Sequence, residues 1–318
     1  MPPTAGRRLL LVHAHPDDES ITTGGTMARY AADPGTHVTL VTCTLGEQGE
    51  VMVPELAGLT ADRGDQLGGY RIGELAGACA ALGVTDQRYL GGAGRWRDSG
   101  MVVVKGVHAA APDTLHPRAF AAKQARAAQV DALAAILDEV EPQVVIGYDS
   151  GGGYGHPDHV RAHEITMAAV DAAPSVRKVY WAVTSRSHVR SGLAALSRAG
   201  ADGHGPPWRV GEPDELPGVP DAVITTQVDV RAHLPAKLAA LRAHATQLTV
   251  WGGAGDGQPA FALTNEIAQP VSDVESFTLV GAAGSVRPVR ESDLFDGIEP
   301  DGIGEPDGIG EPDGIGAP

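Results

Sequence analysis

The 318-residue sequence predicts an α/β protein with a mostly parallel sheet flanked by helices. Short apolar runs, most of them rich in β-branched or aromatic residues, alternate with longer helical patterns. Most of these runs are followed closely by glycine or an acidic residue, as expected where a strand ends in a loop. Hydrophobic residues make up 42% of the chain, enough for the core of one large domain or two small ones. Together these features favour a Rossmann-like sheet in the first half of the chain.

The first half of the sequence contains four expected strands, at residues 9–12, 37–45, 87–92 and 143–149. Three helical patterns lie between them, at residues 25–33, 60–83 and 119–142. The second helix is expected to open at Thr60 and to close at Gly83, since threonine caps helix starts and glycine follows helix ends.

The second half continues the alternation and then becomes irregular. The expected elements are a helix near 157–172, a strand at 178–184, a helix at 191–200, a strand at 223–230, a helix at 233–249 and a strand at 276–281. A Gly- and Pro-rich stretch at 200–220 suggests a boundary between a catalytic domain, 1–200, and a smaller mixed C-terminal part, 201–290, that completes the substrate cleft. Residues 291–318 carry DGIGEP repeats and little to bury, and are expected to be a disordered tail.

Charge and cysteine usage limit the class of protein. The net charge is −16, but the last 28 residues contribute nine acids and no Lys or Arg. The remaining charge of about −7 does not favour a nucleic-acid partner. Only four apolar residues separate Arg8 from His13, too few for a signal peptide or a membrane span. With Cys43 and Cys79 read as reduced thiols, we expect a soluble cytoplasmic protein with no membrane contact and no obligate protein partner.

An acidic cluster follows the first strand, in the run His15-Pro16-Asp17-Asp18-Glu19. A dinucleotide site would need glycines there, because carboxylates repel a pyrophosphate. His15 and Asp18 are instead spaced so that an imidazole nitrogen and a carboxylate oxygen can converge on one divalent ion. A second cluster, residues 150–164, follows the strand at 143–149 and should open at the same sheet edge. His159 there can supply a third ligand, leaving a position for water.

Two histidines and one aspartate suit zinc, and they also suit Fe(II). Asp17, which is not needed as a ligand, is the candidate general base. His156 can face the oxyanion or protonate the leaving amine, Tyr154 can donate to the same intermediate, and Asp158 can orient His156. These roles describe metal-assisted hydrolysis of an amide.

A structural interpretation of the first cluster exists, since acids also favour helix N-termini. Two clusters of histidine and acid at two strand ends of one sheet favour the metal site over that interpretation. Seven histidines lie outside any such context and are expected to be ordinary surface or core residues: His37, His108, His116, His188, His204, His233 and His244.

The two clusters resemble the PIG-L/LmbE superfamily of N-acetylglucosaminyl deacetylases, with A-H-P-D-D-E at 14–19 and H-P-D-H at 156–159. Residues 69–75, 90–101 and 152–160 resemble more closely its actinobacterial members from mycothiol biosynthesis. The similarity covers about residues 7–290. It implies zinc-dependent removal of acetate from 1-D-myo-inositol 2-acetamido-2-deoxy-alpha-D-glucopyranoside, with one ion per subunit.

The same resemblance implies His15, Asp18 and His159 as ligands, Asp17 as base, and His156 with Tyr154 at the oxyanion. It further implies that the amino-sugar inositol substrate is held by three side chains through its hydroxyls: Arg71, Asp98 and Glu50. Without the resemblance, a solvated helix face for Arg71 and a loop cap for Asp98 would be slightly favoured over substrate binding.

Three alternatives remain at this point. The related mycothiol S-conjugate amidases tend to carry lysine seven residues after the histidine of the first motif, where this chain has Thr22. A non-catalytic metal- or sugar-binding protein on the same fold would not require Asp17, Tyr154 and His156 together. A nucleotide-binding protein is disfavoured by the acidic loop.

Overall fold

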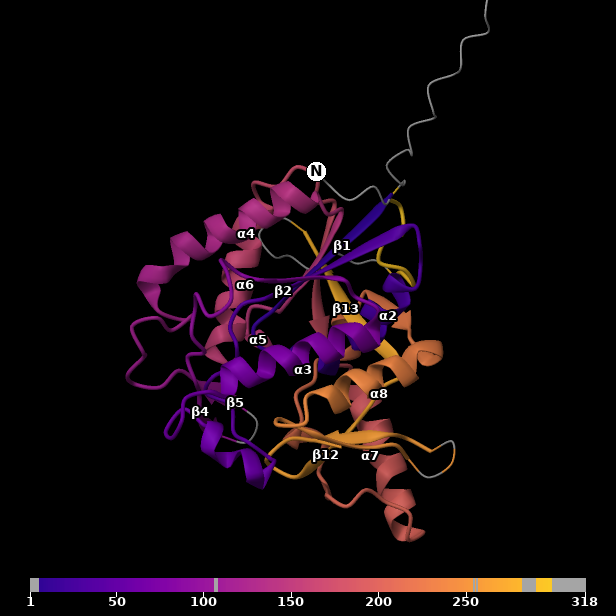
Figure 1. Ribbon diagram of the computed structural model, residues 1–318. Coiled ribbons are helices and arrows are strands. Elements are labelled where there is room, and N and C mark those ends of the chain that lie inside the picture. The colour runs from indigo at the N-terminus through magenta and orange to yellow at the C-terminus, as the bar shows by residue number, and fades with distance from the viewer. Residues whose placement is uncertain (1–5, 106–107, 254, 256, 282–289, 299–318) are drawn as a thin grey trace, which may run out of the picture.

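A seven-stranded sheet runs through the centre of the molecule (Figure 1). The computed structural model describes residues 6–105, 108–253, 255, 257–281 and 290–298. From one edge to the other the strands are β3 (Asp86–Tyr89), β2 (Thr36–Thr42), β1 (Arg7–His13), β6 (Val144–Gly147), β7 (Lys178–Val183), β13 (Val274–Val280) and β9 (Thr226–Asp229). The five strands from β3 to β7 are parallel, and β13 is antiparallel to both β7 and β9. The predicted mostly parallel sheet is confirmed.

Helices cover both faces of this sheet. The larger ones are α2 (Gly24–Ala31), α3 (Leu67–Leu82), α4 (Arg126–Val140), α6 (Pro157–Val170) and α8 (Leu234–Ala243). Another long helix, α7 (Arg186–Ala201), packs instead against Leu216, Ala260 and Ala268. Two short helices, α1 (Asp18–Thr22) and α5 (Gly152–Gly155), lie in loops that leave strands of the sheet. Short 3-10 helices occur at η1 (Pro54–Leu59), η2 (Lys123–Ala125), η3 (Pro213–Glu215), η4 (Asp221–Val223) and η5 (Arg231–His233).

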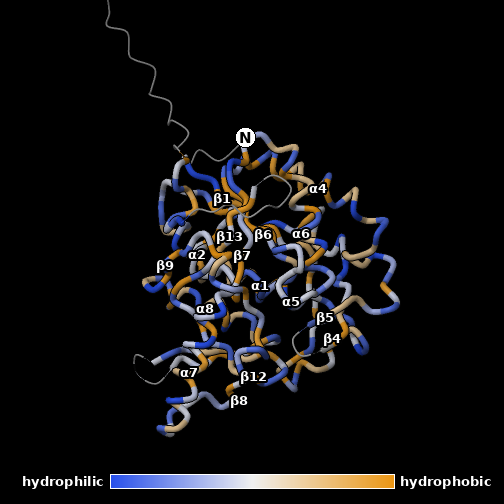
Figure 2. Tube along the Cα trace, turned by 180° about the vertical axis from the view of Figure 1, so that it is seen from behind, coloured by the Kyte–Doolittle hydropathy of each residue, from blue (hydrophilic) through white to orange (hydrophobic). Residues whose placement is uncertain are grey.

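Alternate residues of β1 point into two separate cores, as the pleat of a strand requires. Leu9 and Leu11 pack with residues of α2, α3 and α8, whereas Leu10 and Val12 pack with residues of α4 and α6. Figure 2 shows the central strands as the most hydrophobic part of the trace. Burial on both faces explains why these strands appear in the sequence as continuous apolar runs.

The helix expected at 60–83 begins only at Leu67, after irregular structure that follows η1. Its end is as predicted, because Gly83 adopts φ +75 and its backbone N–H caps the last turn.

Two smaller sheets were not predicted from the sequence. One contains β10 (Thr249–Trp251), β11 (Ala260–Ala262), β12 (Ile267–Pro270) and β8 (Arg209–Val210), and the other pairs β4 (Val102–Lys105) with β5 (His108–Ala110). The proposed boundary at residue 200 needs correction, because β9 and β13 from the C-terminal part complete the main sheet. The loop-rich stretch at 200–220 therefore lies between strands of one sheet.

The expected tail also needs correction at its start. Leu294 and Phe295 are fully or almost fully buried in the core on the α2 side of the sheet. The backbone N–H of Leu294 donates to the hydroxyl of Tyr30 at 2.9 Å. Two apolar residues among many acids and glycines were too weak a signal to predict this packing. The DGIGEP repeats lie outside the described residues.

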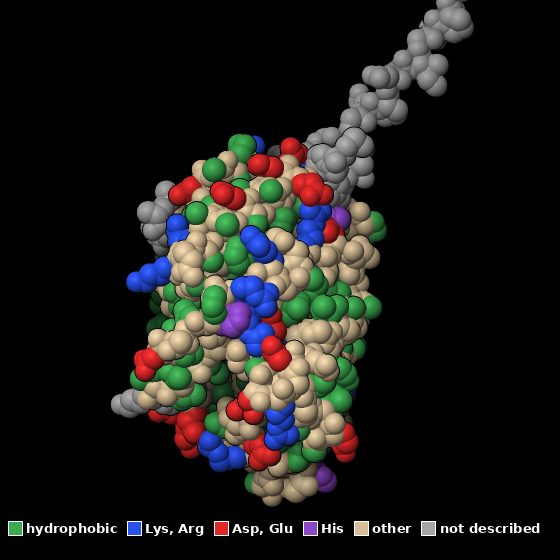
Figure 3. Space-filling view, turned by 60° about the vertical axis from the view of Figure 1, so that its left-hand side comes forward, with side chains coloured by type: hydrophobic (Ala, Val, Ile, Leu, Met, Phe, Trp, Pro, Cys, Tyr) green, Lys and Arg blue, Asp and Glu red, His purple; other side chains and the backbone are tan. Residues whose placement is uncertain are grey.

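Acidic and basic side chains are mixed over the face shown in Figure 3. Among the described residues, no helix is both long enough and apolar enough to cross a membrane.

A buried ion pair connects α8 to the amino end of α2. The ammonium of Lys237 lies 2.6 Å from Glu275 Oε1, and the backbone N–H groups of Gly25 and Thr26 donate to the same carboxylate. Removing one partner of a buried pair leaves an uncompensated charge, which typically costs about 3–5 kcal/mol. We therefore expect Lys237→Met to lower the free energy of unfolding by about 3 kcal/mol, measured by urea denaturation. An unchanged unfolding midpoint would show that the pair contributes nothing to stability.

Candidate metal centre

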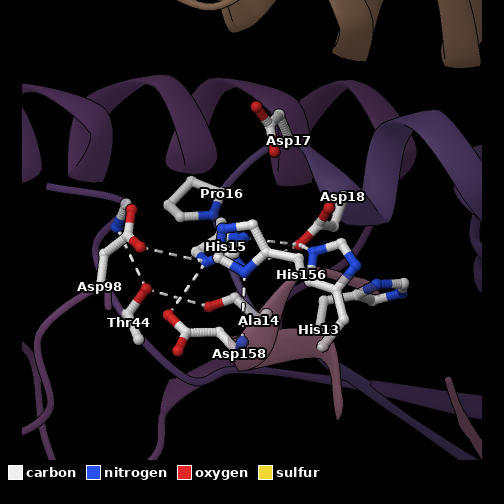
Figure 4. Close-up of polar contacts among 12 residues, drawn as sticks. His13, Ala14, His15, Pro16, Asp17, Asp18, Thr44, Asp98, His156 and Asp158 are labelled. Atoms are coloured by element: carbon white, nitrogen blue, oxygen red, sulfur yellow. Dashed lines mark hydrogen bonds and ion pairs between the residues drawn. The ribbon is translucent and has the colours of Figure 1, made fainter. Parts of the chain in front are cut away.

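The two predicted clusters meet at the carboxyl edge of the main sheet. β1 and β6 are parallel neighbours, so the segments that leave them emerge on the same side. The first segment carries His15 and enters α1 at Asp18, and the second runs through α5 to His156 and His159 at the start of α6. These four residues are all buried, and none is more than 8% exposed. Figure 4 shows His15, Asp18 and His156 close together.

A close approach at Gly152 sets the orientation of His159. Gly152 adopts φ +62, and a Cβ there would lie 2.7 Å from the Cβ of His159, so only glycine fits. The carbonyl oxygen of Gly152 lies 3.2 Å from His159 Nδ1. Because a carbonyl can only accept, Nδ1 carries the proton in the neutral ring and Nε2 carries a lone pair.

In His15 the two ring nitrogens have the opposite roles from those in His159. Its Nε2 lies 3.3 Å from Asp158 Oδ2 and 3.6 Å from Asp98 Oδ1, which assigns the proton of the neutral ring to Nε2. The lone pair on Nδ1 then faces Asp18 Oδ2 at 3.2 Å. His159 Nε2 lies 3.3 Å from the same oxygen and has no hydrogen-bond partner among the described residues.

The residues at this point fit a divalent cation. Two lone-pair nitrogens face one carboxylate oxygen, an arrangement that a positive charge between them stabilises. Ligands held tetrahedrally about 2.0–2.1 Å from zinc lie about 3.3 Å from one another, and the two nitrogens lie 3.2 and 3.3 Å from Asp18 Oδ2. Burial alone would lower the pKa of His15, but the carboxylates of Asp98, Asp158 and Asp18 outweigh it and raise the pKa well above its usual range. The site therefore attracts positive charge.

Two other groups of side chains could also hold a metal ion. The side chains of His15, His156 and His159 offer nitrogens within 4.8 Å of one another, and so do donor atoms of His15, Asp98 and Asp158. In the first group, His156 Nδ1 already accepts from the backbone N–H of Asp158 at 3.1 Å, which leaves only Nε2. In the second, both carboxylates lie on the Nε2 side of His15, the nitrogen to which the proton is assigned. We favour His15, Asp18 and His159, because only there do two lone pairs face a shared oxygen.

Asp158 has a different partner from the one predicted. Its carboxylate contacts His15 Nε2 and accepts from the backbone N–H of Ser99 at 2.9 Å, whereas its own backbone N–H donates to His156. The expectation that its carboxylate orients His156 is therefore wrong. His156 is the N-cap of α6, and its side chain accepts the backbone N–H of Asp158. Asp158 orients His15 instead.

Asp17 has an unusual backbone conformation at φ +115 and lies apart from the histidines (Figure 4). Such a conformation typically costs a residue other than glycine about 1–3 kcal/mol. Its Oδ2 lies 3.0 Å from the guanidinium of Arg71. Burial raises the pKa of Asp17 to about 6, although Arg71 acts to lower it. A carboxylate with this pKa is well suited to accept a proton near neutral pH.

Tyr154 is half-buried beside His156 and His159. Its ring centroid lies 5.1 Å from that of His159 and 6.2 Å from that of His156. Its role at the oxyanion stays a prediction.

The three residues expected to bind substrate differ in environment. Arg71 is 2% exposed and donates to the carbonyl oxygens of Gly46 and Pro16, in addition to its contact with Asp17. Asp98 is buried and accepts the backbone N–H groups of Gln48 and Gly100. Glu50 is exposed, and its carbonyl oxygen accepts from the side chain of Gln247 at 2.9 Å. Their contact with substrate stays a prediction.

Tyr148 is a site residue that the sequence analysis missed. Its hydroxyl donates to Asp18 Oδ2 at 2.8 Å, and its ring stacks on His159 with centroids 4.3 Å apart. It follows β6 directly, at the predicted carboxyl edge, but nothing in the sequence shows which way its side chain points. Groups that hold metal ligands in this way are worth about 10–100-fold in metal affinity.

We expect Tyr148→Phe to weaken metal binding by about 10–100-fold, because Asp18 loses its hydroxyl partner while the stacked ring remains. Competition with a chromogenic chelator measures this affinity. Tyr70→Phe, at a tyrosine that is 46% exposed on α3, is the matched control and should bind metal as the unaltered protein does. Equal affinities in the two variants would contradict the assignment.

Buried histidines and carboxylates at the carboxyl edge of a mostly parallel sheet are typical of a metal-dependent hydrolase. The chain belongs to the GlcNAc-PI de-N-acetylase (PIG-L) family, whose sequence profile matches residues 10–170. This confirms the resemblance predicted from the two motifs.

Relatives of known name match almost the whole chain. A protein of Saccharopolyspora erythraea, named 1D-myo-inositol 2-acetamido-2-deoxy-alpha-D-glucopyranoside deacetylase 1, is 57% identical over 93% of this chain and 95% of its own. A protein of Actinosynnema mirum, named as the deacetylase of the same compound, is 58% identical over 93% of this chain and 98% of its own. Among solved structures, a deacetylase of teicoplanin biosynthesis in complex with teicoplanin matches with a TM-score of 0.49 and 19% identity, over 86% of this chain and 99% of that one.

Proposed function

We propose that this protein is a metal-dependent deacetylase that hydrolyses the N-acetyl amide of 1-D-myo-inositol 2-acetamido-2-deoxy-alpha-D-glucopyranoside to the free amine and acetate, a step of mycothiol biosynthesis. The observation that carries the proposal is the meeting of His15, Asp18 and His159 at one sheet edge. The names of relatives more than half identical to this chain supply the substrate.

In this proposal His15 Nδ1, Asp18 Oδ2 and His159 Nε2 hold one divalent ion per chain. When bound, such an ion supplies Lewis acidity towards the amide carbonyl and lowers the pKa of water. Zinc is the proposed ion, and Fe(II) suits the same ligands. Reconstitution of metal-free protein with each ion, followed by activity measurement under anaerobic conditions, separates the two.

The proton transfers are assigned to side chains of the chain itself. Asp17 accepts a proton from the attacking water, as its raised pKa favours. His156 Nε2 and the hydroxyl of Tyr154 donate hydrogen bonds to the oxyanion, and the proton that Asp17 takes up from water is returned to the departing amine. Glu50, Arg71 and Asp98 are proposed to bind the hydroxyls of the sugar and inositol rings.

Release of primary amine from the proposed substrate by the zinc- or iron-loaded protein tests the function. A mycothiol S-conjugate, assayed in parallel, distinguishes the related amidase activity. Faster release from the acetamido sugar supports the proposal, whereas preference for the conjugate would assign the protein to the amidases. Metal binding without turnover of either compound would leave a non-catalytic binding protein.

We also propose that the protein works in the cytoplasm. Cys43 and Cys79 are both buried and unpaired, as expected of thiols in a reducing compartment.

A further inference from the structure

A fully buried pair of side chains lies behind the first motif. Glu19 Oε1 lies 2.7 Å from His244 Nε2, and neither side chain is exposed to solvent. Glu19 is in α1, and His244 is the C-cap that follows α8, 225 positions later in the chain. The serine hydroxyl of Ser20 donates to the same carboxylate oxygen at 2.5 Å.

The other carboxylate oxygen of Glu19 holds the backbone of Asp17. Glu19 Oε2 accepts the N–H of Asp17 at 2.9 Å, at the residue whose φ is +115. Because an L-residue does not adopt this conformation without support, its neighbours must stabilise it. Arg71 supplies one support through the Asp17 carboxylate and the Pro16 carbonyl, and Glu19 supplies the other through the peptide N–H.

We propose that Glu19 and His244 are positioning residues that fix the strained backbone of Asp17 and so aim the proposed general base. His244 holds the Glu19 carboxylate in one orientation, and the carboxylate holds the Asp17 peptide. In this way α8 in the C-terminal part of the chain supports the loop that follows β1. The kinetic part of this inference rests on the proposed function, whereas the backbone conformation of Asp17 can be tested without an activity measurement.

Kinetics of Glu19→Ala, Glu19→Gln and His244→Phe in the metal-loaded protein provide the first test. A displacement of about 1 Å in a reacting group can cost about 100-fold in rate, so we expect kcat of Glu19→Ala and His244→Phe to fall by about 10–100-fold. KM should change by less than about 2-fold and metal content should stay at one ion per chain, because neither residue is assigned to substrate or metal. Glu19→Gln keeps an acceptor for the Asp17 N–H and should retain more activity than Glu19→Ala.

Lys237→Met is the matched control, since it also breaks a buried ion pair of α8. It should lower stability while leaving kcat per folded, metal-loaded molecule unchanged. Combination of Glu19→Ala with Asp17→Asn separates positioning from general damage to the site. With the base already removed, Glu19→Ala should reduce the residual rate by less than about 2-fold. The proposal would be overturned if Glu19→Ala reduced the rate as much in the Asp17→Asn variant as it does when Asp17 is present.

A crystal structure of Glu19→Ala tests the geometry independently of turnover. We expect the backbone of Asp17 to relax to negative φ and its carboxylate to leave Arg71. Retention of φ near +115 in that variant would overturn the proposal even if the enzyme were active. If the unaltered protein released no amine, the proposed function would be refuted. The φ of Asp17 in the Glu19→Ala structure would still decide whether Glu19 positions Asp17.

Discussion

Asp17→Asn is expected to keep its metal and to lose about 100–10,000-fold in kcat, the usual contribution of a general base. Asparagine has the same size as aspartate and keeps the backbone N–H that donates to Glu19, so the backbone at φ +115 should persist. The amide oxygen can still accept from Arg71, but an amide cannot take up a proton from water near neutral pH. Steady-state kinetics and metal analysis of the same preparation measure the two quantities.

Asp65→Asn provides a closely matched control. Asp65 also has positive φ, at +52, and its carboxylate also pairs with an arginine, Arg97 at 2.6 Å. Its side chain is far more exposed and has no role in the proposed site, so kcat should stay within about 2-fold. Undiminished kcat in Asp17→Asn would refute the base assignment, and loss of metal there would show that Asp17 is a ligand.

His159→Ala is expected to lose the metal, with affinity reduced by more than the 100-fold that a supporting residue contributes. Nε2 of His159 has a free lone pair because Gly152 binds the opposite nitrogen, and alanine offers no replacement. Activity should fall in proportion to the bound ion. Metal content after dialysis, together with chelator competition, measures the effect.

Two further variants decide between the possible ligand sets. Asp18→Asn should also release the ion, whereas His156→Ala should keep about one ion per chain and lose kcat. If His156→Ala released the ion and Asp18→Asn kept it, the three histidines would be the ligands instead. Full metal content in His159→Ala would contradict both sets.

The central strands and the site loops could be predicted because their signals are local. Apolar runs buried on both faces identified β1, β2 and β6, and parallel order placed the loops after β1 and β6 at one edge. The small sheets were missed because their strands have two to four residues each. Whether such short segments pair as strands depends on tertiary contacts, so the periodicity of the sequence does not predict it.

The partners of individual side chains could not be predicted, since they depend on distances across the fold. His244 was expected to be an ordinary surface or core histidine, and its contact with Glu19 joins residues 225 positions apart. Asp158 was assigned to its sequence neighbour His156, but its carboxylate reaches His15 in another segment. Arg71 was assigned to substrate from a motif, and nothing in that motif indicated its contact with Asp17.

The position of β13 has a consequence for synthesis of the chain. β13 lies between β7 and β9, although about 90 residues separate the end of β7 from its start. At a translation rate of about 5–20 residues per second, β7 waits roughly 5–20 s for its neighbour to be made. During that time one edge of a largely formed sheet is open to pairing with other chains. A nascent chain of this protein therefore passes through a period in which chaperone binding or aggregation competes with completion of the sheet.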